Sequence, residues 1–307
     1  NGFLCLSRPY GRMNNQIVGM RGAMAIAFLM NRTLVVPKEM VTIFNQSRLQ
    51  DIMPRIVVPY DAQICSKSKA IGSLPKVCFS RHGCDLSNAN IVQRFIDAAG
   101  SRRAVTLHYI LTFRNSPWSS KLPGFNLETA FYTNLYPNQS ISRAADKFIE
   151  DNFKGRPFAA VHLRWLEGSC LWRIKKYNHG VGSELCSPNR DTFLEVMKEV
   201  VGHTDMPIFV ASDRQLRPAF DSYVDKGDYL YKGPCVGIEC PLIDFEIASR
   251  SNFFVGVIVS SASDTIAKLR RNRPVRHVGK YYRSVLSWSR DKELLAKFAN
   301  ATGGFMI

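Results

Sequence analysis

The 307-residue sequence contains no long hydrophobic run. Its longest unbroken apolar stretch, Ala23–Met30, has eight residues, far short of the roughly 20 that a membrane-spanning helix needs. Internal repeats and low-complexity tracts are also missing, which argues against solenoid and disordered classes. Hydrophobic residues make up 46% of the chain and charged residues 21%. We therefore expect a folded protein of two domains, at roughly 150 residues each, without a membrane span.

The signatures of several enzyme classes are absent too. There is no Walker A string, no G-x-G-x-x-G, no G-x-S-x-G and no H-E-x-x-H, which weakens kinase, dehydrogenase, esterase and zinc-protease interpretations. A D-x-D string is also absent. The nearest match is Asp244-Phe245-Glu246, in a segment of helical spacing where the two carboxylates do not converge. Nothing in the sequence requires a divalent metal, and no cofactor is expected.

Acidic residues are few, since 25 Asp and Glu oppose 41 Lys and Arg and leave a net charge of +16. The basic residues are spread along the chain without zinc-finger, leucine-zipper or RNA-binding patterns, so we expect no nucleic-acid partner. The excess favours acidic ligands such as nucleotide phosphates. The densest basic stretch, Thr265–Arg290, has no acidic residue. We interpret it as a solvent-exposed face, with a phosphate or partner surface as the alternative.

Cysteines and glycosylation sequons indicate the compartment. The eight cysteines form no C-x-x-C pair and stand at Cys5, Cys65, Cys78, Cys84, Cys170, Cys186, Cys235 and Cys240. The Asn-x-Ser/Thr sequons begin at Asn31, Asn45, Asn138 and Asn300. Asn31 lies at an expected helix end beside a strand, where we expect it to be hidden. We expect a disulfide-bonded glycoprotein of the secretory lumen, with the endoplasmic reticulum as its compartment; a cytosolic protein with free thiols is the alternative.

The first half of the chain predicts a β-α-β unit followed by an irregular insertion. Phe3–Leu6 and Thr33–Pro37 are short apolar runs typical of buried strands, and Gln16–Asn31 between them has helical spacing. Residues 38–100 mix Pro, Ser, Asn and three cysteines, which predicts a partly helical insertion held by disulfide bonds. Val105–Ile110 predicts a further strand.

The second half alternates helices and strands in a regular order. After helix Ser142–Phe153, which ends the first half, the expected elements are strand Phe158–Arg164, helix Asp191–Val201, strand Ile208–Ala211, helix Asp244–Arg250, strand Phe253–Val257, helix Ala262–Arg271 and helix Ser284–Phe298. This order predicts an α/β protein with two Rossmann-like domains, residues 1–155 and 156–307, facing a central cleft. Ligands are expected at the carboxyl ends of the parallel strands. The last helix can lie against either domain.

Three segments follow expected strand ends and open helices, where backbone N–H groups and the helix dipole favour phosphates and sugars. The first is Gly11–Gln16. Arg12 offers a planar charged fork, and Asn14 and Asn15 offer neutral donors and acceptors. This set suits a phosphate together with sugar hydroxyls, and a polar helix cap is the alternative.

The second segment, Val161–Arg164, ends the strand that opens the second half. Strand alternation places His162 and Arg164 on one face, so both can contact a single ligand. Arg164 is suited to neutralise a leaving diphosphate and His162 to contact a ribose or phosphate, with a surface strand end as the alternative. The third segment, Val259–Ser263, offers hydroxyls and helix N-terminal amides as a phosphate cradle, or a simple serine N-cap.

Taken in order along nearly the whole chain, these segments resemble the GDP-fucose protein O-fucosyltransferases, most closely the type that modifies EGF-like domains. The resemblance is carried by Gly11–Gln16, Asn31–Pro37, His162-Leu163-Arg164, Asp244 ahead of Phe253–Gly256, Ser260-Ser261, and Cys170 and Cys186 after the His-Leu-Arg motif. It implies a GT-B fold and metal-independent, inverting transfer of fucose. The donor would be GDP-fucose, and the acceptor a Ser or Thr hydroxyl of a folded, disulfide-rich domain such as an EGF-like domain.

The same resemblance implies roles for individual residues. Arg164, together with Asn15, would be catalytic, with Arg164 stabilising the leaving group as the glycosidic bond breaks. Donor contacts are implied for Arg12, Met13, Asn14, Asn15, His162, Leu163, Arg164, Asp244, Ser261 and Ala262. The N-terminal domain would lie on the acceptor side, and the C-terminal domain would bind the GDP-sugar. No residue is expected to bind a metal.

The sequence departs from this family's pattern at several positions. Asn14 stands where the family usually has glycine, and Ala262 where it usually has phenylalanine. Trp165–Glu167 also differs from the pattern after the arginine. A general base is not evident: Glu167 is the carboxylate nearest the motif, but its odd spacing from Arg164 turns it away if the strand continues.

Two other functions are kept as alternatives. One is a fucosyltransferase that acts on a glycan, for example forming α1,2 or α1,6 linkages, or a transferase for another GDP-sugar. Trp165 after Arg164 argues against it, because a doubled His-x-Arg-Arg motif is absent. The other is a lectin-like or chaperone-like protein without turnover, against which the retained polar site residues argue.

Overall fold

The computed structural model divides into two compact units, Asn1–Asn138 and Gln139–Ile307. The residues that it describes are 2–7, 13–52, 58–59, 62–66, 69–70, 89–108, 127–163, 195–196, 198–199, 206–212, 228–229, 231, 233–257, 260–273 and 283–286. The division falls before the expected boundary at residue 155. The reason is that helix α7 (Gln139–Phe153) packs against α12 (Glu239–Ser249) and so belongs to the second unit.

A parallel sheet forms the centre of the first unit. Its described strands are β1 (Gly2–Ser7), β2 (Arg32–Val36), β3 (Val58–Pro59), β4 (Lys69–Ala70) and β5 (Ala104–His108). They lie in the order β3-β2-β1-β5-β4, and every pairing is parallel. The strands expected near Phe3, Thr33 and Val105 are confirmed as β1, β2 and β5. Strands β3 and β4 were not expected, because each has only two residues, too few to show the alternation of apolar and polar residues that predicts a strand.

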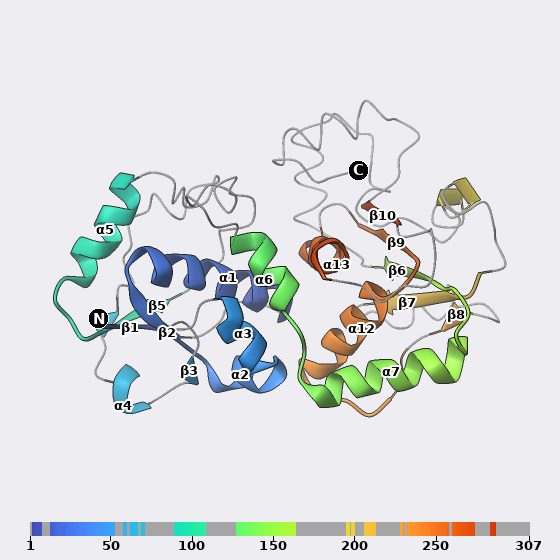
Figure 1. Cartoon of the computed structure of the whole chain (residues 1–307), viewed down its shortest axis with the longest axis horizontal. Helices are drawn as coiled ribbons and strands as arrows, with labels where there is room; N and C mark the ends of the chain where they lie inside the picture. Colours follow the sequence, from blue (N-terminus) through green and yellow to red (C-terminus); the bar gives the residue numbers. More distant parts are fainter. Residues whose placement is uncertain are drawn as a thin grey trace. The chain divides into compact units, whose positions relative to one another are not determined.

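Helix α1 (Met13–Leu29) joins β1 to β2 and packs on both strands (Figure 1). Ala, Met and Ile occupy all sides of this helix, so it is buried nearly all round. It ends at Leu29, and Asn31 in the turn that follows has a φ of 51°, the left-handed conformation that Asn tolerates after a helix C-terminus. Asn31 is exposed there, so the expectation that it would be hidden is wrong.

The insertion after β2 is partly helical, as expected. Its described helices are α2 (Lys38–Ile43), α3 (Gln46–Ile52), α4 (Ala62–Cys65) and α5 (Ala89–Ala99). A disulfide between Cys5 of β1 and Cys65 of α4 ties the insertion to the sheet, and both cysteines pack with Val35. Helix α6 (Leu127–Asn134) completes the unit by packing against α3 and α1.

A second parallel sheet forms the centre of the second unit. Its described strands are β6 (Ala159–Leu163), β7 (Ile208–Ser212), β8 (Asp228–Tyr229), β9 (Phe253–Gly256) and β10 (Arg283–Leu286), in the order β10-β9-β6-β7-β8. All described pairings are parallel. Every residue of β6 and β9 is buried, as expected for inner strands with both faces covered. Two parallel sheets confirm the predicted α/β class.

Helix α12 lies between α7 and α13 (Ser261–Asn272) in the second unit (Figure 1). Phe148 of α7 meets Phe153, Phe209 and Tyr231 edge-on, and Phe153 stacks on Phe158 at 4.1 Å between ring centroids. These aromatic contacts join α7 to the strands of this unit. The helices expected over Ser142–Phe153, Asp244–Arg250 and Ala262–Arg271 are confirmed as α7, α12 and α13, of which α12 begins five residues earlier than expected and ends one residue earlier.

The helix expected over Ser284–Phe298 is wrong at its start. Residues Arg283–Leu286 form β10, which pairs in parallel with β9 at the edge of the sheet. Residues 287–298 and most of the helix expected over Asp191–Val201 lie outside the described residues. No helix in the part of the chain that the structure describes is long and apolar enough to cross a membrane.

Candidate functional site

The strand order of the second unit marks where a ligand is expected. From β6 the chain moves outward to β7 and β8, and it then returns to the other side of β6 to form β9 and β10. The order therefore reverses between β6 and β9. In doubly wound α/β sheets, ligands bind outside the carboxyl ends of the strands at this point. His162 and Leu163 end β6, and Gly256 ends β9.

A hydrogen-bonded bridge joins the two strands at this position. The Ser263 hydroxyl of α13 lies 2.7 Å from Nδ1 of His162, and it accepts the backbone N–H of Val257 at 2.9 Å. Ser263 is fully buried and His162 is 6% exposed. The imidazole is therefore held at the end of β6 by a group that also fixes the backbone after β9.

Gly256 allows this close packing. A Cβ at Gly256 would lie 2.7 Å from the Ser263 Cβ and 2.8 Å from its hydroxyl oxygen. Carbon atoms do not approach so closely, so any larger residue would force α13 away from β9. From the sequence, Ser263 is only one of a run of hydroxyls, and no role is expected for Gly256. A glycine at a strand end before a serine-rich helix start was the available signal.

The N-terminus of α13 points to anion binding. Ser260 occupies the N-cap position but makes no side-chain cap hydrogen bond, and its hydroxyl oxygen is buried without a partner. Ser260 is therefore the N-cap residue by position, but its hydroxyl does not cap the helix. Ser261 and Ala262, both buried, follow in the first turn. The only acidic residue of that turn, Asp264, is paired with Lys268 at 3.0 Å. The helix start can thus take a phosphate without an unpaired carboxylate beside it.

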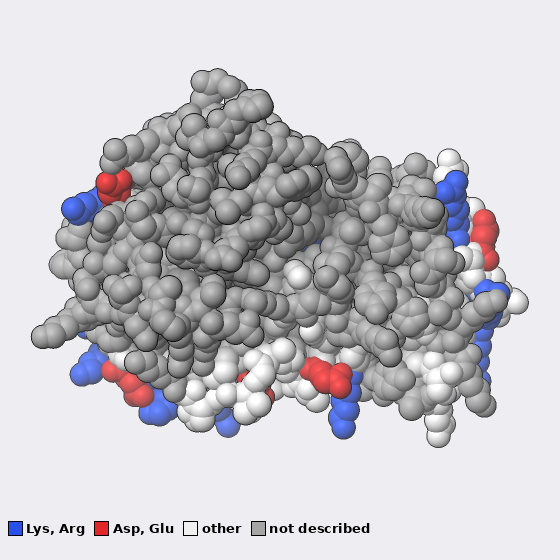
Figure 2. Space-filling view, turned by 180° about the vertical axis from the view of Figure 1, so that it is seen from behind, with Lys and Arg blue, Asp and Glu red and all other residues white. Residues whose placement is uncertain are grey.

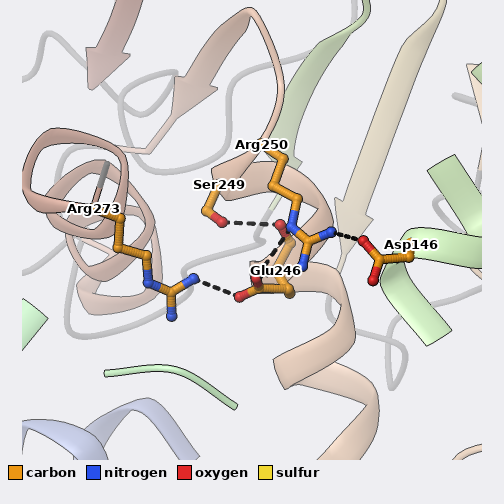
Figure 3. Close-up of polar contacts among 5 residues, drawn as sticks. All are labelled: Asp146, Glu246, Ser249, Arg250 and Arg273. Atoms are coloured by element: carbon orange, nitrogen blue, oxygen red, sulfur yellow. Dashed lines mark hydrogen bonds and ion pairs between the residues drawn. The ribbon is translucent and has the colours of Figure 1, made fainter. Parts of the chain in front are cut away.

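Asp244 and Glu246 both lie on α12 and are buried, but Glu246 is neutralised. Its carboxylate accepts from Arg273 at 2.6 Å and from two nitrogens of Arg250, at 3.1 and 2.8 Å (Figure 3). Arg250 also donates to Asp146 of α7. The Glu246 carboxylate is therefore held by two arginines. The structure places Asp244 on a different helix from Ser261 and Ala262.

Charge and burial compete at Glu246. Burial on its own raises the pKa of this carboxyl, but the guanidinium groups of Arg273 and Arg250 outweigh it and lower the pKa below its ordinary value. Burial likewise lowers the pKa of Arg250, and Glu246 and Asp146 outweigh it and raise that pKa. The network is charged at neutral pH and joins α7, α12 and the end of α13 (Figure 3).

The expectation that Thr265–Arg290 forms a solvent-exposed face is wrong for two of its arginines. Arg270 is 2% exposed and donates to the carbonyl of Ala248 in the last turn of α12 and to those of Ser251 and Asn252 just beyond it. Arg273 is bound to Glu246. These cations are structural. On the face shown in Figure 2, the described Lys and Arg side chains lie beside Asp and Glu rather than in a patch of one sign.

The first unit has its own reversal of strand order, between β1 and β5. Helix α1 begins just after β1, with Met13 buried, Asn14 6% exposed and Asn15 half-buried. Both polar atoms of the Asn14 amide are buried without a hydrogen-bond partner. A ligand or water molecule that forms hydrogen bonds with the oxygen and nitrogen of this amide would remove the cost of burying them unpaired.

Solved structures of known enzymes match the chain along most of its length. POFUT1 bound to GDP-fucose covers 93% of this chain and 98% of its own, at 19% identity and a TM-score of 0.61. POFUT1 bound to GDP matches at 22% identity and a TM-score of 0.56. NodZ α-1,6-fucosyltransferase soaked with GDP-fucose covers 88% and 93% of the two chains, at 14% identity and a TM-score of 0.56, and NodZ from Bradyrhizobium matches at 0.55. No family model and no curated protein sequence matches.

This chain has the GT-B fold of these fucosyltransferases. Within the GT-B fold, the structure brings together His162 with the start of α13, whereas Met13, Asn14 and Asn15 lie in the first unit. Arg12, Arg164, Glu167 and the two cysteines Cys170 and Cys186 lie outside the described residues. In the described ranges, no group of three or more His, Cys, Asp or Glu side chains is placed to hold a metal ion.

Proposed function

We propose that this protein transfers fucose from GDP-fucose to an acceptor hydroxyl. The observation that carries the proposal is the arrangement at the switch point of the second unit, where His162 meets the uncapped start of α13. It occurs in a chain with the fold of POFUT1 and NodZ, both of which have been solved with GDP-fucose.

The start of α13 suits the diphosphate of the donor. Backbone N–H groups in the first turn of a helix and the positive end of its dipole bind phosphate oxygens. The buried hydroxyl of Ser260 adds a donor, and Ser261 and Ala262 lie in the same turn. His162 would contact the ribose or the diphosphate, with Leu163 beside it, and Asp244 would contact the donor from α12. In the first unit, Arg12, Met13, Asn14 and Asn15 would contact phosphate and sugar groups.

We assign transition-state stabilisation to Arg164, one residue beyond the end of β6, with Asn15 as a second catalytic residue. The acceptor hydroxyl attacks the anomeric carbon from the face opposite GDP, the bond from that carbon to the phosphate oxygen breaks, and the configuration inverts. The hydroxyl proton passes to a base, and the electron pair of the broken bond remains on GDP. The guanidinium of Arg164 compensates the negative charge that develops there, so the reaction proceeds without a metal.

A protein acceptor is favoured over a glycan acceptor. POFUT1 aligns at 19–22% identity and over 97–99% of its length, whereas NodZ aligns at 14% and over 91–93%. Trp165 after Arg164 also departs from a doubled arginine motif. We therefore propose a Ser or Thr hydroxyl of a folded, disulfide-rich domain of the EGF-like kind. A glycan or another GDP-sugar as substrate remains the second candidate, and Asn14 in place of glycine is the residue that favours it.

We also propose that the protein works in the secretory lumen, in the endoplasmic reticulum. Each of the four described cysteines forms a disulfide, Cys5 with Cys65 and Cys235 with Cys240. The Asn45 sequon is well placed for N-glycosylation. It is exposed at the start of α3, its side-chain oxygen accepts from Ser47 at 2.7 Å, and its side-chain nitrogen is unoccupied. Such a glycan requires passage through the secretory lumen.

A transfer assay tests the proposed activity. Recombinant EGF-like domains and a glycan acceptor are incubated with GDP-fucose and chelator, and fucosylated product is measured by mass spectrometry. We expect product only on the EGF-like domain, and we expect Arg164→Ala to lower the rate about 100-fold or more. Arg271→Ala, which removes an exposed arginine of α13, is the control and should leave the rate unchanged. Product on the glycan alone would overturn the protein-acceptor assignment.

A further inference from the structure

The hydroxyl of Ser263 has a position that donor binding alone does not explain. It is fully buried, at a depth where no solvent can satisfy it. Its two partners are the backbone N–H of Val257, at 2.9 Å, and Nδ1 of His162, at 2.7 Å. Both contacts cross from α13 to the carboxyl ends of the strands that flank the switch point.

Hydrogen-bond accounting decides which group donates to which. The amide of Val257 can only donate, so the Ser263 oxygen accepts that bond. The hydroxyl proton of Ser263 then needs an acceptor, because leaving a buried donor unsatisfied costs the desolvation of that group. His162 Nδ1 is the acceptor within reach. The imidazole is therefore neutral, with its proton on Nε2.

We infer that Ser263 is a positioning residue, which holds His162 in the Nε2–H form and fixes the plane of its ring. Resting on the proposed function, this makes His162 a neutral donor through Nε2–H toward a ribose or phosphate oxygen of the nucleotide. A neutral imidazole donates a hydrogen bond to a ligand oxygen without adding positive charge to the site. The positive charge there is supplied by Arg164. Ser263 itself does not touch the donor.

Gly256 is the second half of this arrangement. The Ser263 side chain fits against the backbone of β9 only because Gly256 has no Cβ. A methyl group at that position would meet both the Cβ and the hydroxyl oxygen of Ser263 at less than 3 Å. The expected consequence of Gly256→Ala is a displaced hydroxyl and a released imidazole, although no polar atom has been removed.

Three variants separate positioning from general stability. Ser263→Ala removes the hydroxyl, and Ser263→Thr keeps it. Thr265→Val is the matched control, because Thr265 carries a second fully buried hydroxyl on the same helix, and that hydroxyl has no hydrogen-bond partner. His162→Gln identifies the His162 signal among the six histidines of the chain.

The experiment records the tautomer of His162 by long-range ¹H–¹⁵N correlation on histidine-labelled protein, without ligand, and measures GDP affinity by calorimetry. We expect only the Nε2–H form in the wild type and in Thr265→Val. In Ser263→Ala we expect a shifted Nδ1 resonance, a measurable Nδ1–H population and about tenfold weaker GDP binding. Ser263→Thr should restore both readouts.

Two results would overturn the inference. One is an Nδ1–H tautomer in the wild type, and the other is a Ser263→Ala protein with an unchanged His162 spectrum and unchanged GDP affinity. Failure of the wild type to bind GDP is a different result, because it contradicts the proposed function while the tautomer measurement still decides the role of Ser263.

Discussion

Replacing Glu246 with glutamine should destabilise the second unit strongly, even though the shape of the side chain is kept. Glu246 and Arg273 have side chains that are 5% and 7% exposed, and their oxygen and nitrogen lie 2.6 Å apart. Glutamine removes the negative charge that both arginines share. If its oxygen stays with Arg250, its amide nitrogen faces Arg273, and two donors then meet.

The size of the effect follows from the burial of each partner. Breaking a buried ion pair by removing one member costs about 3–5 kcal/mol, because the other charge stays buried and unpaired. Arg250 is 26% exposed and keeps Asp146, so most of the loss arises at Arg273. We therefore expect a loss of about 3 kcal/mol, which corresponds to a fall of roughly 6–12 °C in the melting temperature of this unit.

The effect depends on pH in a defined direction. The two arginines lower the folded-state pKa of Glu246 below its ordinary value, so the carboxylate stabilises the fold above the unfolded-state pKa. That stability is lost as the pH falls through the folded-state pKa. The difference between wild type and Glu246→Gln should be largest at neutral pH and should shrink under strongly acidic conditions.

Urea unfolding followed by circular dichroism, at pH 7 and at a series of lower pH values, measures this difference. Asp151→Asn is the control, because it removes only a surface ion pair with Lys147 on α7, and its free energy of unfolding should match that of the wild type. A free energy of unfolding of Glu246→Gln that lies within about 1 kcal/mol of the wild-type value at pH 7 would show that the buried ion pairs contribute little. So would a difference that stays constant with pH.

Three further outcomes are expected. Replacing Cys5 and Cys65 with alanine opens a cross-link of sequence separation 60 and should cost about 4 kcal/mol in urea unfolding; a loss below 1 kcal/mol would contradict the disulfide's role. Expression in secreting eukaryotic cells should give a glycan at Asn45, seen as a mass shift that Asn45→Gln abolishes, and glycosylation at Asn138 alone would contradict the placement. Asp244→Ala should weaken GDP-fucose binding about tenfold with the fold retained, and unchanged affinity would remove Asp244 from the site.

Much of the fold could be predicted because its signals are local. Helix α1 is predicted by the helical spacing of its apolar residues, and strand β6 by a short apolar run. Both signals lie within the element that they predict. Strand β10 could not be read in this way. Its four residues lie in a window of helical spacing, and they form a strand because β9 offers them a partner. Such pairing is a property of the assembled sheet.

The site was predicted in part for the same reason. Alternation along a strand end singled out His162. Its partner Ser263 lies 101 residues later, so only the fold could join them. Arg270 and Arg273 were assigned to an exposed face from their charge, because the carbonyls beyond the end of α12 and the carboxylate of Glu246 that cover them are distant in sequence. Burial of a charge depends on partners that a charge count does not show.

Calorimetric titration of the wild-type protein with GDP, GDP-fucose, GDP-mannose and UDP-sugars shows whether the protein is selective for the proposed donor. The titrations are run with chelator and then with Mn²⁺. We expect GDP and GDP-fucose to bind with an affinity that is unchanged by the metal, and GDP-mannose and UDP-sugars to bind at least tenfold more weakly. Selective binding of GDP-mannose, or no binding of any nucleotide, would contradict this expectation.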